Sequence, residues 1–231
     1  METNMEKQLL DNNRRFERKY ISELNKSWMF RDKLIEKNFI KIYEKRKVIS
    51  LYFDTVDYKF FKDNIEGTGN RVKARLRWYQ NSNNTNNKIK TTLELKKKRG
   101  FVGTKKQLSF GTYESLSKLL ELCKKFHFQN KVSNVVKQQI FPVLITSYDR
   151  EYYLNINKKF RSTIDTNLKV IPINNLSLSV PINKEILELK YDTKYDEDFR
   201  NTVTDSDFKF RFQKFSKYVV SLLNLKNNGL I

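Results

Sequence analysis

The stretch from Arg71 to Tyr79 contains the side chains best placed to do chemistry. From Arg71 to Arg77, cationic and apolar residues alternate strictly, so a β-strand would put on one face Arg71, Lys73, Arg75 and Arg77. Same-face neighbours lie roughly 7 Å apart and repel by about 0.6 kcal/mol in water, or about 2.4 kcal/mol at an effective dielectric of 20. Such a row either stays in solvent or binds a strongly negative ligand.

The charge balance of the whole chain favours the second reading. Its 231 residues include 46 Lys and Arg against 26 Asp and Glu, a net charge of +20. A charge of that size indicates a polyanionic partner, such as nucleic acid, anionic lipid or a phosphate-rich substrate. Hydrophobic residues make up 39% of the chain and aromatic residues 13%, enough for a real core.

The sparse Cys and His residues exclude several kinds of site. Cys123 and His127 are the only residues of their types, so neither an internal disulfide nor a Cys/His zinc site can form. Their spacing of four suits packing on an amphipathic helix better than a catalytic pair. The sequence shows no secretory signal and no apolar run of membrane-spanning length. It therefore predicts a soluble, cytoplasmic protein.

The elements that must position the cations show the same alternation. Period-two patterns predict strands at residues 16–21, 48–53, 71–79, 89–98, 142–153, 161–166 and 186–191. Apolar residues at helical spacing predict helices at residues 22–37, 113–126 and 208–225. The polar run 81–87 predicts a hairpin loop. Without a Gly- or Pro-rich linker or an internal repeat, we expect one domain over residues 1–231.

Several strands with one charged face indicate a closed sheet. In a barrel, interior and exterior positions alternate, so closure would direct every charged face into one lumen. The inward set is mostly positive but includes the acids Glu17, Glu94, Asp165 and Glu188. Unpaired buried charge is costly, and a mixture of this kind suits a metal ion together with a chain of phosphates.

The order of these motifs resembles that of a known family. The chain is similar to the polyphosphate polymerase domain of the vacuolar transporter chaperone (VTC) family, within the triphosphate tunnel metalloenzymes, also called CYTH-like proteins. The resemblance covers about residues 16–218. Its motifs are Phe16-Glu17-Arg18-Lys19-Tyr20, Ser50-Leu51-Tyr52-Phe53-Asp54-Thr55, Arg75-Leu76-Arg77-Trp78-Tyr79, Leu93-Glu94-Leu95-Lys96, Tyr148-Asp149-Arg150, Arg161-Ser162-Thr163-Ile164-Asp165-Thr166, Leu187-Glu188-Leu189-Lys190 and Lys214-Phe215-Ser216-Lys217-Tyr218.

The resemblance implies an α+β fold, a closed antiparallel β-barrel tunnel of about eight strands with flanking helices. It also implies a phosphotransferase that moves the γ-phosphoryl group of ATP onto inorganic polyphosphate, with Mn²⁺ or Mg²⁺. The catalytic set that it indicates is Lys19, Arg75, Arg77, Lys96, Arg150 and Arg161. The further substrate-binding residues are Arg15, Lys73, Lys105 or Lys106, Lys190, Lys214 and Lys217. Glu188 takes the place of the metal ligand, with Glu17 and Glu94 as supporting acids.

Two departures from the family pattern matter. Hydrolytic members begin with a Glu-x-Glu-x-Lys strand, but here Arg15 stands where the first Glu would be, which favours the polymerase branch. The membrane helices of eukaryotic complexes are lacking, so export through a membrane would require another subunit.

Phosphoryl transfer asks mainly for positioning and charge neutralisation, which the planar fork of arginine supplies. Arg75 and Arg77 could grip successive phosphates, and Lys214 and Lys217, three apart on the predicted helix, could both face the tunnel mouth. The alternative role of Glu188 is an ion pair with a nearby Lys or Arg.

Two other functions stay open on the sequence alone. One is a triphosphatase acting on tripolyphosphate or on nucleoside or RNA 5′-triphosphates. The other is a non-catalytic binder of polyphosphate or nucleic acid. Nucleic-acid binding would favour exposed aromatic residues among the cations, whereas here most aromatic residues lie in helices or on apolar strand faces. We therefore expect no nucleic-acid partner.

Overall fold

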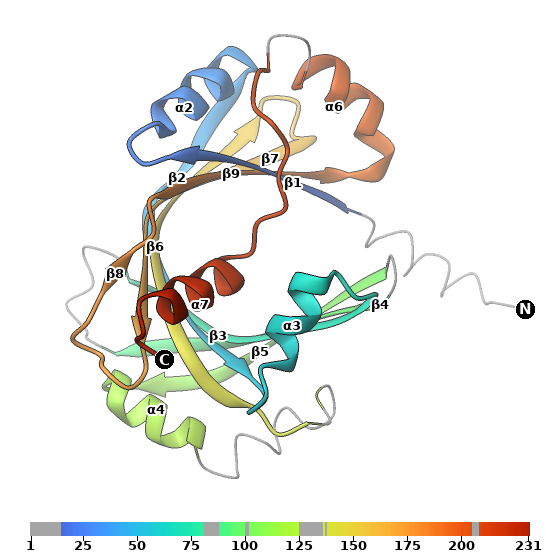
Figure 1. The fold of residues 1–231 in the computed structure, drawn as a ribbon. Helices are drawn as coiled ribbons and strands as arrows, with labels where there is room; N and C mark the ends of the chain where they lie inside the picture. Colours follow the sequence, from blue (N-terminus) through green and yellow to red (C-terminus); the bar gives the residue numbers. More distant parts are fainter. Residues whose placement is uncertain (1–14, 81–87, 100–101, 125–135, 137, 205–207) are drawn as a thin grey trace, which may run out of the picture. The chain divides into compact units, whose positions relative to one another are not determined.

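The computed structural model describes residues 15–80, 88–99, 102–124, 136, 138–204 and 208–231 (Figure 1). The predicted loop at 81–87, the residues before Arg15, and His127 lie outside this part of the chain.

The described strands form one antiparallel sheet. They are β1 (Arg15–Glu23), β2 (Phe39–Asp54), β3 (Asn70–Gln80), β4 (Ile89–Arg99), β5 (Val102–Tyr113), β6 (Phe141–Asn155), β7 (Phe160–Pro172), β8 (Val180–Pro181) and β9 (Lys184–Asp192). Their order is β1-β9-β7-β6-β2-β3-β4-β5, and β8 pairs with β7. Each predicted strand is confirmed, and β5 and β8 are additional.

The prediction of a closed barrel is wrong, because the nine-stranded sheet is open. Its end strands are β1 and β5, and they do not pair with each other. The outer edge of β1 is instead covered by an extended segment near the C-terminus. Tyr20 forms a bridge with Phe212, and the backbone N–H of Gln213 donates to the carbonyl oxygen of Lys19 at 2.9 Å. A β1 edge that is already hydrogen-bonded in this way does not need β5.

The helices that the structure describes are α2 (Ser27–Glu36), α3 (Lys59–Glu66), α4 (Leu116–Lys124), α6 (Asp196–Thr202) and α7 (Lys217–Asn227). The sequence did not predict α3 and α6. The predicted helix 208–225 is wrong in its first half, because the chain before Ser216 is extended. Lys214 therefore does not share a helix with Lys217. No helix among the described residues is long and apolar enough to cross a membrane.

Contacts divide the chain into two compact units. The first unit contains Met1–Lys45, Asp149–Leu168 and Asn183–Phe215, and the second contains Arg46–Tyr148, Lys169–Ile182 and Ser216–Ile231. Each unit has a hydrophobic core made of its own residues. That the whole chain forms one domain stays a prediction.

In the first unit, one face of β1, β7 and β9 is apolar and buried. Leu187, Leu189 and Tyr191 of β9 share this face, and their alternation with Glu188 and Lys190 is what the sequence predicted. Helices α2 and α6 lie together on the same side of β1 and β9 (Figure 1). They contribute buried aromatic and aliphatic side chains, so Glu188 and Lys190, which alternate with the buried residues of β9, point to the opposite face.

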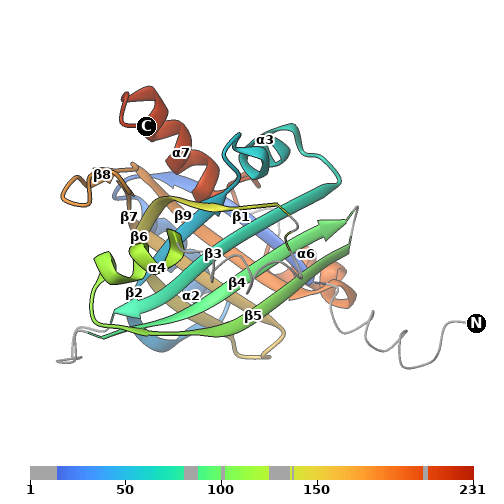
Figure 2. The same ribbon diagram turned by 90° about the horizontal axis from the view of Figure 1, so that it is seen from below.

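In the second unit, β3, β4 and β5 run side by side and α4 covers one face of them (Figure 2). Ala74, Leu76 and Trp78 of β3 are buried against this side together with Leu119 and Cys123 of α4. The strict alternation of β3 therefore separates a core face from a cationic face, as its sequence predicted.

The coverage of the β1 edge can be tested by removing one backbone donor. Gln213→Pro deletes the N–H that reaches the carbonyl oxygen of Lys19, whereas Gln213→Ala keeps it. We expect the proline variant to have a free energy of unfolding lower by about 1 kcal/mol than that of the alanine variant, measured by urea denaturation. Equal stabilities would contradict the pairing.

Candidate functional site

Antiparallel pairing arranges the polar side chains of the second unit in rows across its strands. Residues directly opposite in such a pair share a face of the sheet. One row contains Tyr52, Arg75, Glu94 and Gln107, from β2, β3, β4 and β5. The neighbouring row begins with Ser50, Arg77 and Thr92. Both rows lie opposite the apolar core, so these polar residues form one continuous surface.

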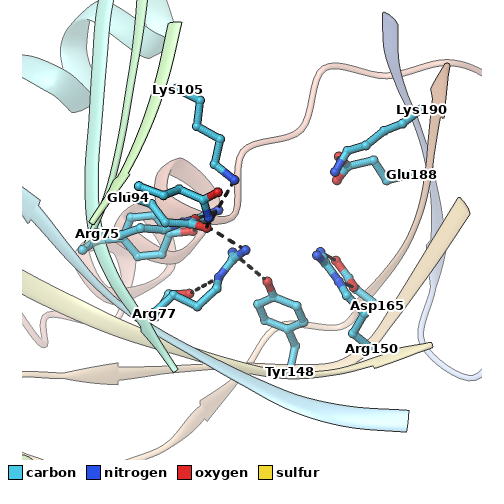
Figure 3. Close-up of polar contacts among 12 residues, drawn as sticks. Arg75, Arg77, Glu94, Lys105, Tyr148, Arg150, Asp165, Glu188 and Lys190 are labelled. Carbon is cyan, nitrogen blue, oxygen red and sulfur yellow. Dashed lines mark hydrogen bonds and ion pairs between the residues drawn. The ribbon is translucent and has the colours of Figure 1, made fainter. Parts of the chain in front are cut away.

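Glu94 is the centre of this surface (Figure 3). Its Oε2 accepts a hydrogen bond of 2.7 Å from Nε of Arg75 and lies 3.5 Å from Nη1 of Arg77. Its Oε1 lies 3.3 Å from Nζ of Lys105 and accepts from Nε2 of Gln107 at 2.7 Å. The Glu94 side chain is only 6% exposed. One buried carboxylate therefore holds three predicted phosphate-binding cations close together.

The charge of Glu94 depends on these neighbours. Burial alone would raise its pKa, but Arg75, Arg77 and Lys105 outweigh burial and lower the pKa from 4.5 to about 2. Burial likewise opposes the charge of Arg75, but Tyr52 and Glu94 raise the pKa of its guanidinium above the ordinary value. At neutral pH Glu94 and Arg75 are therefore both ionised.

Aromatic and hydroxyl groups hold the two guanidinium groups in place. Arg75 donates from Nη1 to the hydroxyl of Tyr52 at 3.2 Å. Arg77 donates from Nη2 to the hydroxyl of Tyr148 at 3.1 Å, and from Nε to Ser50 Oγ at 3.3 Å.

None of these supporting residues has a role that was predicted from the sequence. Ser50 and Tyr52 could have been found, because the alternation of their strand places them on its polar face. Gln107 belongs to a strand that was not predicted, and Tyr148 is too distant in sequence from Arg77 to be inferred as its partner.

A second cationic row lies one step along the same strands. Lys73 of β3 is directly opposite Lys96 of β4, which is directly opposite Lys105 of β5, and Arg71 is opposite Lys98. Like charges directly across a sheet are destabilising, and a bound anion would relieve that repulsion.

The register also separates the two neighbouring lysines of β5. Lys105 is on the face of Glu94, whereas Lys106 is opposite Leu95 on the other face. Of these two lysines, only Lys105 therefore lies on the same face of the sheet as Arg75 and Arg77.

In the first unit, acids and cations alternate across β1 and β9. Lys19 is directly opposite Glu188, and Glu17 is directly opposite Lys190. Within β9, Nζ of Lys190 lies 2.9 Å from Oε1 of Glu188 (Figure 3). An ion pair with a nearby Lys or Arg was the alternative role predicted for Glu188. Lys19 also donates from Nζ to the carbonyl oxygen of Phe215 at 2.9 Å.

The other predicted residues of the first unit have varied surroundings. Arg150 forms a two-pronged, buried pair with Asp165, with distances of 2.6 Å from Nε and 2.7 Å from Nη2. Arg161 is exposed and directly opposite Lys190, and Arg15 is opposite Asp192. Their roles in binding phosphate stay predictions.

The two C-terminal lysines are also separated. Lys214 is exposed in the extended segment, whereas Lys217 begins α7 and places Nζ 4.6 Å from the centre of the Tyr148 ring. Lys217 therefore contacts Tyr148, the aromatic support of Arg77. Cys123 is buried in the core, and burial raises its pKa to about 12, so its thiol is not poised for nucleophilic chemistry.

The acidic residues that the structure describes are too dispersed to form a metal site made of protein ligands alone. The described residues contain no group of three or more His, Cys, Asp or Glu side chains that could hold a metal ion. Mg²⁺ commonly takes one or two carboxylates and completes its coordination with water and substrate phosphates. Glu188 is a carboxylate of the kind that such a cation takes, and its role as the metal ligand stays a prediction.

Comparison with known proteins identifies the family. The model of the VTC domain matches residues 14–226, which confirms the resemblance predicted from the motifs. No curated protein gives a significant match.

Three solved structures illustrate the similarity in fold. The chain is similar to a proposed adenylate cyclase from Vibrio parahaemolyticus, with a TM-score of 0.52, 11% identity, and coverage of 90% of this chain and 98% of that one. A conserved hypothetical protein from Pyrococcus furiosus gives a TM-score of 0.49 and 9% identity, with coverage of 89% and 99%. A proposed adenylyl cyclase from Hippeastrum, described as having a dominant triphosphatase activity, gives 0.46 and 13%, with coverage of 90% and 96%. At 11% identity, the likeness to the Vibrio parahaemolyticus protein concerns the fold alone.

The lowered pKa of Glu94 predicts a loss of stability in acid. A carboxylate whose pKa is lower in the folded state stabilises that state above its unfolded pKa of 4.5, and this contribution disappears as pH falls towards about 2. We expect Glu94 to contribute about 3 kcal/mol, lost between about pH 5 and about pH 2.

Urea denaturation over that pH range would measure this contribution. Between about pH 5 and about pH 2, the free energy of unfolding of Glu94→Gln should fall by less than that of the unmodified protein, and the difference should be about that amount. Glu66→Gln, at an exposed position near the end of α3, should behave like the unmodified protein. Parallel curves for Glu94→Gln and the unmodified protein would contradict the assignment.

Proposed function

We propose, since the chain belongs to the VTC domain family, that it is a metal-dependent polyphosphate polymerase. In this reaction a terminal oxygen of polyphosphate attacks the γ-phosphorus of ATP. The bond between that phosphorus and the β,γ-bridging oxygen breaks, ADP leaves, and the polymer grows by one phosphate. Family membership itself supports a function related to polyphosphate or triphosphate, and the direction towards synthesis is our proposal.

The observation that supports a polymeric substrate is the length of the cationic surface. Basic side chains follow one face of β3 from Arg77 to Arg71 and continue across β4 and β5. The six residue steps from Arg71 to Arg77 of an extended strand span about 20 Å, which is longer than three linked phosphates. A triphosphate would occupy one end of this surface, whereas a polyphosphate chain could extend along it.

The residues would divide the work as phosphoryl transfer requires. Arg75 and Arg77, held in place by Glu94, Tyr52 and Tyr148, would neutralise charge on the phosphates without reorganising. Glu188 would hold Mn²⁺ or Mg²⁺, a Lewis acid that polarises phosphoryl oxygens. Lys190, now paired with Glu188, would be free to pair with phosphate once a metal takes that carboxylate. A triphosphatase acting on tripolyphosphate or nucleoside triphosphates is the alternative.

The first test is product formation. Purified protein would be incubated with ATP and Mn²⁺, and the products resolved on a gel stained for polyphosphate. Long chains support the polymerase, free phosphate alone would indicate a hydrolase, and no turnover would leave a binder.

We expect Arg75→Ala, Arg77→Ala and Glu188→Ala each to abolish turnover, because each removes a group that the proposed reaction needs. Lys97→Ala is the matched control, since Lys97 is opposite Val72 on the other face of the sheet. Activity close to that of the unmodified protein in two of the three site variants would exclude the proposed site.

The two neighbouring lysines of β5 offer an internal comparison. We expect Lys105→Ala to weaken polyphosphate binding about tenfold, since a hydrogen bond to a charged group contributes about 1.5 kcal/mol. Lys106→Ala should leave binding unchanged, because this side chain is on the opposite face. Titration calorimetry at fixed ionic strength would measure both dissociation constants. Equal losses would show that general charge, not the face of the sheet, governs binding.

A further inference from the structure

The first turn of α7 is connected to three successive cations of β3 in the second unit. Ser216 Oγ accepts a hydrogen bond of 3.2 Å from Nζ of Lys73. Lys217 places its ammonium over the ring of Tyr148, whose hydroxyl accepts from Arg77. These two contacts already connect the start of one helix to both ends of the row from Lys73 to Arg77.

The third connection runs through two stacked tyrosines. The ring of Tyr218 stacks on that of Tyr52, with centroids 5.3 Å apart and an angle of 22° between the planes. The hydroxyl of Tyr52 then accepts from Nη1 of Arg75, whose guanidinium lies 5.9 Å from the centre of the Tyr52 ring. Ser216, Lys217 and Tyr218 therefore reach Lys73, Arg77 and Arg75 by three separate routes.

A buried carboxylate fixes this turn of α7. Asp54 is 0% exposed and Tyr218 is 3% exposed, and the Tyr218 hydroxyl donates to Oδ2 of Asp54 at 2.5 Å. Asp54 also accepts from the backbone N–H groups of Thr55 and Phe60 at 2.8 Å and of Phe61 at 2.9 Å. These donors stabilise the buried charge, and those of Phe60 and Phe61 belong to the first turn of α3.

The hydrogen bond between Tyr218 and Asp54 has a fixed direction. Burial, and then the negative charge of Asp54, raises the pKa of Tyr218 above its ordinary value, so the phenol keeps its proton and donates. Because α3 also packs against α7, this bond joins the end of β2 to both helices at one point. Figure 1 shows α3 and α7 next to each other within the second unit.

We propose that Asp54 and Tyr218 are positioning residues for the phosphate-binding cations. The hydrogen bond between them sets the place of the first turn of α7, and that turn sets the side-chain positions of Lys73, Arg75 and Arg77. Neither residue would touch phosphate itself. The inference rests on the proposed function, because it assumes that these cations bind phosphates.

Tyr218→Phe is the direct test, because it removes the hydroxyl and keeps the stacked ring. We expect this variant to bind inorganic tripolyphosphate about tenfold more weakly, by titration calorimetry at fixed ionic strength and well below the unfolding temperature. Leu225→Ala is the matched control: it removes a fully buried side chain of the same helix that is not in this network. That variant should lose stability but keep its affinity for tripolyphosphate.

A double-mutant cycle separates positioning from a purely structural role. If Tyr218 acts through the cations of β3, Tyr218→Phe should weaken binding much less when Arg75 is already alanine. Additive losses, or a loss in Leu225→Ala equal to that in Tyr218→Phe, would overturn the positioning role.

Binding of tripolyphosphate by the unmodified protein distinguishes a failure of the positioning role from a failure of the proposed function. If it binds tripolyphosphate and Tyr218→Phe binds equally well, the positioning role is wrong and the proposed function stands. If the unmodified protein does not bind tripolyphosphate, the proposed function fails and the positioning role fails with it.

Discussion

Electrostatic repulsion among cations on one face of a sheet is the constraint on which the second unit depends. Lys73 is directly opposite Lys96, which is directly opposite Lys105, and this row is next to the one that contains Arg75. Glu94 offsets part of this repulsion by contacting Arg75, Arg77 and Lys105 from a buried position. Cations held close together in this way are ready to bind a polyanion, because their ordering is already accomplished in the folded protein.

The first unit solves the same problem differently. There Lys19 is opposite Glu188 and Glu17 is opposite Lys190, so neighbouring charges attract across the strands. Arg150 and Asp165 form a buried pair with two hydrogen bonds, which further balances charge. The first unit therefore has a face on which acids and cations are balanced, whereas the face of the second unit around Glu94 is strongly positive. The difference follows from where acids occur on otherwise similar strands.

The sequence predicted the faces of the strands well because the period of two is a local property. It failed where distant contacts decide the structure. Phe208, Phe212 and Phe215 are spaced as in a helix, yet Phe212 pairs with Tyr20 and the ring of Phe208 packs 4.9 Å from that of Tyr20, so the segment is extended. Closure of the sheet was predicted from the charged faces of the strands and from the resemblance to the family. Whether a sheet closes depends on its two edge strands, and a covered β1 edge cannot be inferred from alternation.

The same limit applies to the supports of the site. The alternation of β3 identified Arg75 and Arg77, but their partners Tyr52 and Tyr148 come from distant strands. Asp54 is the clearest example of a support that the sequence does not reveal. It directly follows a predicted strand, and that position indicates only where the strand ends. In the structure its carboxylate accepts from α3 and from Tyr218 of α7, 164 residues away. A buried charge needs several hydrogen-bond donors. The donors to Asp54 connect the end of β2 to α7, the helix that begins beside the cations.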